Sequence, residues 1–305
     1  MMDLNLLYQW CSIPMEELVS HPALKIRLRI VEDAQEMGRV MAKDLADEIW
    51  KAAREQRVFR LIVPCGPKEW YEPFAQMINE EQIAMKHVVC YHMDENLDWE
   101  ARLLPENDPN NFHTFMEEYF YGAVREELRV PAENRHYLTP DNVNWMSREI
   151  MSHSIDYTLG GWGQDGHVAF NQARRNPYAV VTADDIRNSR ARVQENNWDT
   201  ILALAHRSMG AAWQFMPPMS VTLGVKECFS AKKIRVYSAT GAWKQTALRI
   251  ALFSDVTEEF PMTLLQEHPD ALITATRETA CHPIAEHPEW EFRGVDRKIG
   301  LESDG

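Results

Sequence analysis

A glycine-rich stretch in the middle of the chain carries a carboxylate and an imidazole, side chains well suited to moving protons. Residues 160–172 read Gly-Gly-Trp-Gly-Gln-Asp-Gly-His-Val-Ala-Phe-Asn-Gln and follow the apolar run 155–159. The glycines permit a tight turn and a close approach of backbone to a ligand. They place Asp165 and His167 beyond the end of an expected strand, where open α/β sheets bind their ligands. The stretch therefore indicates an active site, although an ordinary strand-to-helix turn has a similar composition.

Short runs of β-branched and aromatic residues alternate along the chain with helical patterns. The expected strands are residues 26–31, 59–64, 87–92, 155–160, 220–225, 234–238 and 271–275. Helix-length intervals separate several of them, and this alternation is typical of parallel sheets. The sequence thus predicts an α/β fold with a doubly wound, largely parallel sheet and helices on both faces.

Two segments show clear helical patterns. Asp33 is an expected N-cap with Glu36 three residues later, and apolar residues then recur on one face. A second helix is expected at about residues 241–253, where we expect Lys244 to be exposed.

The chain divides into three expected parts. Residues 1–24 form an N-terminal extension, expected to pack as an extra helix on the body or on a neighbouring subunit. Residues 25–292 are expected to form a single α/β domain, and residues 293–305 a polar tail that frays.

The composition excludes several classes of function. The chain has 305 residues, 45% of them hydrophobic, and a formal net charge of −14, which disfavours binding to nucleic acid or to anionic membranes. No apolar run approaches the roughly 20 residues of a membrane span, and the first residues lack the basic region of a signal peptide. The five cysteines form no Cys-x-x-Cys pattern, which is typical of reduced thiols. We therefore expect a cytoplasmic protein that binds a small molecule and no metal.

Several segments together resemble one known family. The run Gly-x-Asp-Gly-His-Val-Ala-Phe-Asn at 163–171, together with Met93-Asp94-Glu95 after an expected strand, resembles the glucosamine-6-phosphate deaminase (isomerase) family. That family shares its fold with the 6-phosphogluconolactonases. Further matches follow in the family's order at residues 110–120, Asn188-Ser189-Arg190, residues 221–225, Lys244 and His268-Pro269. The resemblance covers roughly residues 25–280.

The resemblance implies a reaction and a role for each catalytic residue. Such an enzyme opens the ring of a 2-amino aldose phosphate, moves a proton from C2 to C1 and releases ammonia. Asp94 would be the base at C2, and His167, oriented by Asp165, would open the ring. Gln172 stands where the family has a glutamate, and an amide cannot exchange a proton, so the family's relay is incomplete.

The resemblance also implies a phosphate site. Its substrate-binding residues would be Cys65, Gly66, Lys68, Glu95, Gly163, Arg190 and Lys244. Arg190 offers a planar fork for bidentate contact, and Lys244 offers a point charge near a helix start. The family's Thr-Gly-Gly-Thr-Pro loop is replaced by Cys65-Gly66-Pro67-Lys68-Glu69-Trp70, and proline has no N–H to donate. We therefore expect a remodelled phosphate cradle, a phosphorylated sugar as partner, and no organic cofactor; a homo-oligomer stays open.

Two alternative functions stay open beside the deaminase. The nearest is a 6-phosphogluconolactonase-type hydrolase in which His167 activates water, although a lactonase is expected to continue Asp-Gly-His with a Thr-Ala-Ser-like run. The other is a sugar-phosphate-binding regulator without turnover. Gln172 favours this reading, whereas the presence of Asp94 and the lack of a basic helix-turn-helix segment oppose it. Trp162 could stack on a sugar face or belong to the core.

Overall fold

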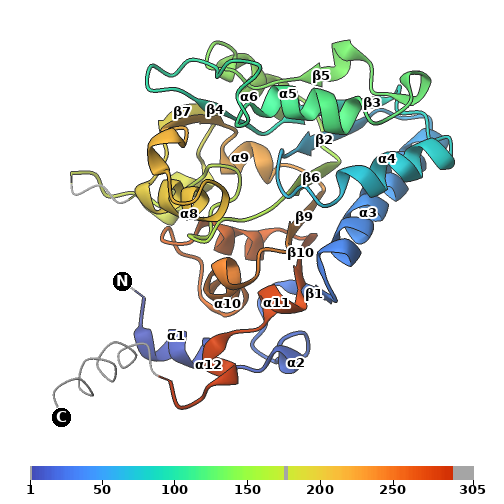
Figure 1. Ribbon diagram of the computed structural model, residues 1–305. Coiled ribbons are helices and arrows are strands. Elements are labelled where there is room, and N and C mark those ends of the chain that lie inside the picture. Colours follow the sequence, from blue (N-terminus) through green and yellow to red (C-terminus); the bar gives the residue numbers. More distant parts are fainter. Residues whose placement is uncertain (1, 175–177, 291–305) are drawn as a thin grey trace.

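Residues 2–174 and 178–290 are described by the computed structural model, and within them seven parallel strands form the central sheet (Figure 1). Across the sheet the order is β1 (Arg27–Val31), β10 (Ala271–Thr276), β9 (Lys233–Ser238), β6 (Tyr157–Gly160), β2 (Phe59–Val63), β3 (Val88–His92) and β5 (Arg135–His136). Each neighbouring pair is parallel. The chain runs outwards from β2 to β5 and then returns to β6 on the other side of β2, so the strand order reverses between β2 and β6.

Helices cover both faces of this sheet. On one face lie α3 (Ala34–Arg54) and α4 (Tyr71–Glu80), and on the other lie α6 (Val143–Ser152) and α10 (Gln245–Phe253). Successive residues of β2 enter different cores: Leu61 and Val63 join the cluster beneath α3, and Ile62 joins the cluster beneath α6. The predicted doubly wound, largely parallel α/β fold is confirmed.

Among the remaining helical segments, α8 has 11 residues and the others have eight or fewer. They are α1 (Leu4–Cys11), α2 (Met15–Leu18), α5 (Phe112–Met116), α7 (Ala183–Arg187), α8 (Trp198–Ser208), α9 (Val225–Cys228), α11 (Arg277–Ala280) and α12 (Pro283–Glu286), with a π-helical turn at Glu117–Tyr121 and 3-10 turns at Glu126–Leu128, Ala132–Asn134, Trp213–Phe215, Gly241–Lys244 and Pro261–Glu267. No helix in the described part of the chain has the length and apolar character needed to cross a lipid bilayer.

Of the two expected helices, one begins at its predicted cap and the other begins later than predicted. Asp33 caps α3 as expected, because its carboxylate accepts the Glu36 N–H at 2.8 Å. The segment expected to be helical over 241–253 begins as a 3-10 turn, and α10 starts only at Gln245. Lys244, expected to be exposed, is partly buried at this change of geometry.

One predicted strand lies in a different sheet from the others. The strands β1, β2, β3, β6, β9 and β10 agree with their predictions to within two residues at each end. The strand expected at 220–225 is instead β8 (Met219–Thr222), the centre of an antiparallel sheet in the order β4 (Asp94–Leu97), β8, β7 (Arg192–Glu195). The sequence does not predict β4, β5 or β7, which have four residues at most.

Met93, between β3 and β4, links the two sheets through its backbone. Its N–H donates to the Val63 carbonyl at 3.0 Å, and its carbonyl accepts the Leu223 N–H at 2.8 Å. The first bond continues the parallel sheet and the second continues the antiparallel one. Asp94 follows directly, opposite Thr222 of β8. The backbone at the start of β4 is therefore held from both sheets.

The N-terminal extension packs on the last part of the body. α1 lies against α10 and α12 (Figure 1). The guanidinium of Arg249, buried in α10, donates to the Ile13 carbonyl at 3.1 Å. Residues 1–24 thus contact this same chain, while the tail expected at 293–305 lies outside the described residues.

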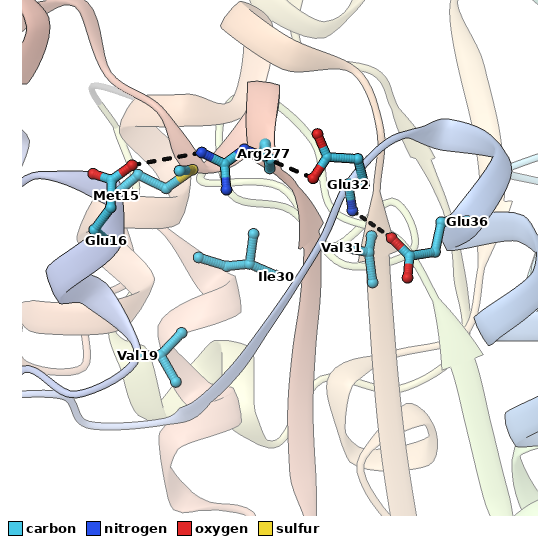
Figure 2. A pocket seen from close by; sticks show the side chains of 8 residues that line it. All are labelled: Met15, Glu16, Val19, Ile30, Val31, Glu32, Glu36 and Arg277. Carbon is cyan, nitrogen blue, oxygen red and sulfur yellow. Dashed lines mark hydrogen bonds and ion pairs between the residues drawn. The ribbon is translucent and has the colours of Figure 1, made fainter.

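A small hollow of about 300 Å³ lies between α2 and the end of β1. Figure 2 shows Arg277 between two carboxylates there, forming ion pairs with Glu16 at 3.6 Å and with Glu32 at 3.9 Å. Glu36 adds a third carboxylate, which accepts the Glu32 N–H at 2.6 Å. With three carboxylates and one guanidinium, this hollow has the wrong charge for a phosphate.

Candidate active site

A cavity of about 510 Å³ lies at the carboxyl ends of the central strands. It is lined by the loop after β2, the junction of β3 and β4, the glycine-rich turn after β6, the loop after β9, and α8. The cavity thus includes the point between β2 and β6 where the strand order reverses, which is where open α/β sheets bind ligands. Six of the residues singled out from the sequence line it: Cys65, Gly66, Lys68, Asp94, His167 and Lys244.

Asp94 is the carboxylate at the junction of the two sheets. Burial and the neighbouring Glu95 raise the pKa of its side chain to about 8. Because the carboxyl group lines the cavity, a bound ligand could reach it. A carboxylate with so high a pKa is a stronger base than an ordinary aspartate once it has lost its proton.

Glu95 does not line the cavity, but its hydrogen bonds stabilise one part of the cavity wall. Its two carboxylate oxygens accept the N–H groups of Phe112 at 2.8 Å and His113 at 2.7 Å, at the start of α5. Phe112 lines the cavity. Burial raises the pKa of Glu95 to about 7, although these hydrogen bonds oppose the shift. Its contacts are therefore those of a residue that supports the wall rather than one that meets a ligand.

His167 and Asp165 form a close pair in the turn after β6. His167 Nδ1 lies 2.6 Å from Asp165 Oδ1, so the Nε2 atom is the ring nitrogen left for a ligand. Burial alone would raise the pKa of Asp165, but attraction to His167 holds it below its ordinary value. The carboxylate therefore fixes the orientation of the imidazole.

Gly163 makes room for this pair without lining the cavity. A Cβ atom at this position would lie 2.2 Å from His167 Cε1 and 2.5 Å from Asp165 Oδ1. Only a glycine fits between the start of the turn and the imidazole. Its contribution is thus to the placement of His167.

Gln172 points away from the cavity and is almost fully buried. Its Oε1 accepts the Asn197 N–H at 2.9 Å, and its Nε2 donates to Thr200 Oγ1 at 2.7 Å. Both partners belong to the first turn of α8 or the residue before it. The amide therefore ties the catalytic turn to α8.

Three basic side chains line the cavity, and together they are called its cationic side. Lys68 follows β2, Lys244 follows β9, and Arg207 comes from the last turn of α8. Burial, and then the nearby positive charge of Arg207, lowers the pKa of Lys244 to about 8. Two cations that repel each other in a concave site form a good receptor for an anion.

The loop after β2 is packed tightly against α3. A Cβ atom on Gly38 of α3 would lie 2.1 Å from the Glu69 carbonyl oxygen, so this glycine lets the loop settle on the helix. Lys68 Nζ lies 4.0 Å from the centre of the Phe115 ring, a cation–π contact. Burial raises the pKa of the Cys65 thiol. The thiol thus stays neutral and adds no negative charge.

Trp162, which borders the cavity, is buried in the core.

Arg190 lies outside the cavity. Its guanidinium contacts Ser147 Oγ at 3.2 Å and Glu227 Oε1 at 3.7 Å, and about half of its side chain is exposed. The segment before it packs against the turn into α9, where Ser189 Oγ accepts the Val225 N–H at 3.0 Å. Among the described residues that line the cavity, the arginine is Arg207.

The sequence does not predict α8. Arg207, Ser208 and Thr200, which lie on this helix, are therefore not among the predicted site residues. Signals for this helix exist: Asn197 precedes it, Asp199 lies in its first turn, and His206 and Arg207 lie in its last. Its apolar pattern is weak, because different faces of the helix meet the body, the cavity and solvent. Trp198 and Leu202 are exposed, whereas Ile201 is buried.

Comparison with known proteins identifies the family to which the chain belongs. The family model described as glucosamine-6-phosphate isomerases/6-phosphogluconolactonase matches residues 32–192, more than half of the chain. The chain belongs to this family. It is therefore an enzyme of the deaminase, isomerase and lactonase group, as predicted.

Relatives of known sequence carry the deaminase name. The glucosamine-6-phosphate deaminase of Serratia proteamaculans is 29% identical over 259 residues, covering 81% of this chain and 89% of its own. That of Phocaeicola vulgatus is 27% identical over 254 residues, covering 81% and 90%.

Solved structures share the fold. A monomeric glucosamine-6-phosphate deaminase superposes with a TM-score of 0.70 at 20% identity, covering 84% of this chain and 99% of its own. The 6-phosphogluconolactonase of Thermotoga maritima gives a TM-score of 0.59 at 15% identity, covering 82% and 99%. At these identities the likeness concerns the fold alone.

A side chain at position 163 should disable the enzyme by displacing the imidazole. We expect Gly163→Ala to lower kcat/KM by about 100-fold, since a displacement of about 1 Å at a catalytic group has an effect of that size. Gly160→Ala is the matched control, because a Cβ atom there would meet only ordinary contacts at 3.7 and 3.8 Å. Steady-state kinetics of both variants test this, and equal activity in the two would contradict it.

Proposed function

We propose that this enzyme converts an amino-sugar phosphate, glucosamine 6-phosphate or a close relative, into a ketose phosphate and ammonia. One observation carries the proposal: Asp94, His167 and the cations Lys68, Lys244 and Arg207 line a single cavity. A base, an acid and an anion receptor in one site match a phosphorylated sugar that must lose a carbon-bound proton. The names of the relatives support the same reaction.

In the proposed mechanism, His167 opens the ring and Asp94 moves the proton. His167 gives a proton to the ring oxygen and the anomeric hydroxyl loses one, which yields the open aldehyde. Asp94 then removes the proton from C2, and the C–H electron pair forms a C1–C2 double bond. The C1–O double bond opens at the same time, and the aldehyde oxygen takes up a proton, which gives an enolamine. Return of a proton to C1 gives a C2 imine, and addition of water to that imine releases ammonia and leaves the ketose.

The phosphate of the substrate would lie at the cationic side of the cavity. Lys68, Lys244 and Arg207 would supply charge, with Ser208 and Thr240 as nearby hydroxyl donors. Glu69 also lines this region, so the three cations and this carboxylate sum to +2 when Lys244 is charged. That charge matches a phosphate dianion.

The cellular setting also remains a proposal. We place the enzyme in the cytoplasm, which the five free cysteines support. A homo-oligomer stays open, and light scattering would decide the oligomeric state.

The first test follows ammonia and fructose 6-phosphate together from glucosamine 6-phosphate. We expect both products in equal amounts, and a loss of about 10²–10⁴-fold in kcat for Asp94→Asn, because the amide cannot act as a base. Hydrolysis of 6-phosphogluconolactone without any ammonia would identify a lactonase instead. Binding of the sugar phosphate without any product would identify a regulator.

The second test separates the two arginines. We expect Arg207→Ala to raise KM for the sugar phosphate by about 10- to 100-fold, since charged hydrogen bonds to the phosphate would be lost. Arg190→Ala, which removes a guanidinium paired with Glu227 outside the cavity, should leave KM within about twofold. The opposite order would assign phosphate binding to Arg190.

The third test is the dependence of kcat/KM on pH. Asp94 becomes a base as pH rises through about 8, whereas Lys244 loses its charge over the same range. We therefore expect a narrow bell with its maximum near pH 8, measured from about pH 6 to 10. Lys244→Arg should remove the alkaline limb, because guanidinium stays charged. A rate that stays flat down to about pH 5 would show that Asp94 ionises like an ordinary carboxyl group.

A further inference from the structure

We propose that Thr200 and Gln172 are positioning residues for the catalytic pair, and that α8 links anion binding at Arg207 to the placement of His167. This inference rests on the proposed function, since it assumes that the cationic side of the cavity receives the phosphate. Neither Thr200 nor Gln172 lines the cavity. Both would act on the reaction only through Asp165.

A chain of hydrogen bonds joins the imidazole to α8. His167 Nδ1 lies 2.6 Å from Asp165 Oδ1, and the Thr200 hydroxyl donates to Asp165 Oδ2 at 3.4 Å. Gln172 Nε2 donates to Thr200 Oγ1 at 2.7 Å. Asp165, Gln172 and Thr200 are at most 5% exposed. Because the chain is buried, water cannot easily replace its members.

The direction of each bond in this chain is fixed by one backbone group. The Asn197 N–H can only donate, so the atom of Gln172 that faces it at 2.9 Å must be Oε1. Nε2 therefore faces Thr200, and the Thr200 oxygen accepts from it. The single proton of the hydroxyl is then left for Asp165.

A glutamate at position 172 would reverse this chain. Its carboxylate could accept from Asn197 and from the Thr200 hydroxyl, which would take the hydroxyl proton away from Asp165. A second negative charge would also be buried beside that carboxylate. The amide of Gln172 thus suits Thr200, and in this chain it serves to orient the pair rather than to carry a proton.

The same helix carries a side chain of the anion site at its other end. Thr200 lies in the first turn of α8, whereas Arg207 and Ser208 lie in the last turn and line the cavity. Seven residues of helix separate Thr200 from Arg207 by only about 10 Å. The Thr200–Asp165 distance of 3.4 Å is long for an O–H···O bond, so a small shift of α8 that shortens this distance would strengthen the bond. An anion held by Arg207 would favour such a shift.

Two readouts on the full-length enzyme test the positioning role. We expect Thr200→Val to lower kcat by about tenfold with little change in KM, and Thr200→Ser to restore most of kcat, because the serine keeps the hydroxyl. Thr158→Val is the matched control: it removes a buried hydroxyl that donates to the Cys228 carbonyl, away from the catalytic pair. Equal kcat in wild type and Thr200→Val, or an equal loss in Thr158→Val, would overturn the assignment.

The second readout needs no turnover and so remains valid if the proposed reaction is wrong. The proton on His167 Nδ1 is followed by NMR with and without inorganic phosphate. We expect phosphate to shift this signal in the wild type, and not in Thr200→Val or Arg207→Ala. The link between Arg207 and His167 would be overturned if phosphate does not shift the wild-type signal, or if it does shift the signal of Thr200→Val.

Gln172→Glu gives an independent check that does not depend on the folding of the Thr200 variants. We expect it to lower kcat and to move the His167 signal, because the hydroxyl proton turns away from Asp165. An increase in kcat would overturn the inference and would mean that position 172 exchanges protons.

Discussion

The backbone at Met93 is the constraint on which the site depends. Its N–H belongs to the parallel sheet and its carbonyl to the antiparallel one, so neither sheet can move without moving this residue. Asp94 comes next, and its position is therefore fixed by two sheets rather than by a flexible loop. The glycine-rich turn follows β6, which is hydrogen-bonded to β2, and lines the same cavity as Asp94. The base and the acid thus stand on one continuous network of backbone hydrogen bonds.

The cavity is less charged than its residues suggest. Burial favours the neutral form of Asp94 and, together with Arg207, the neutral form of Lys244. A dianion beside Lys244 would restore its charge, since an opposite charge favours the ionised form. Ligand binding and protonation are therefore coupled in this site. The whole chain has a formal net charge of −14, so the cationic side is a local exception.

Sequence patterns predict those parts of the structure that have a strong period or a specific motif. The long strands and the cap of α3 at Asp33 are of this kind, as is the turn that brings Asp165 to His167. β4, β5 and β7 escape prediction because their two to four residues are mostly polar and form no apolar run. α8 escapes because its faces meet three environments. Arg207 reaches the cavity through α8, so a sequence reading that does not predict this helix does not find Arg207 either.

The bond direction at Gln172 also bears on how this sequence can change over time. The hydroxyl of Thr200 and the amide of Gln172 make one unit, because each decides which way the other bonds. Replacing either alone breaks the chain to Asp165, whereas a change at both positions could preserve an orientation of the imidazole. The two positions, 28 residues apart in sequence, should therefore be inherited together among relatives that carry this helix.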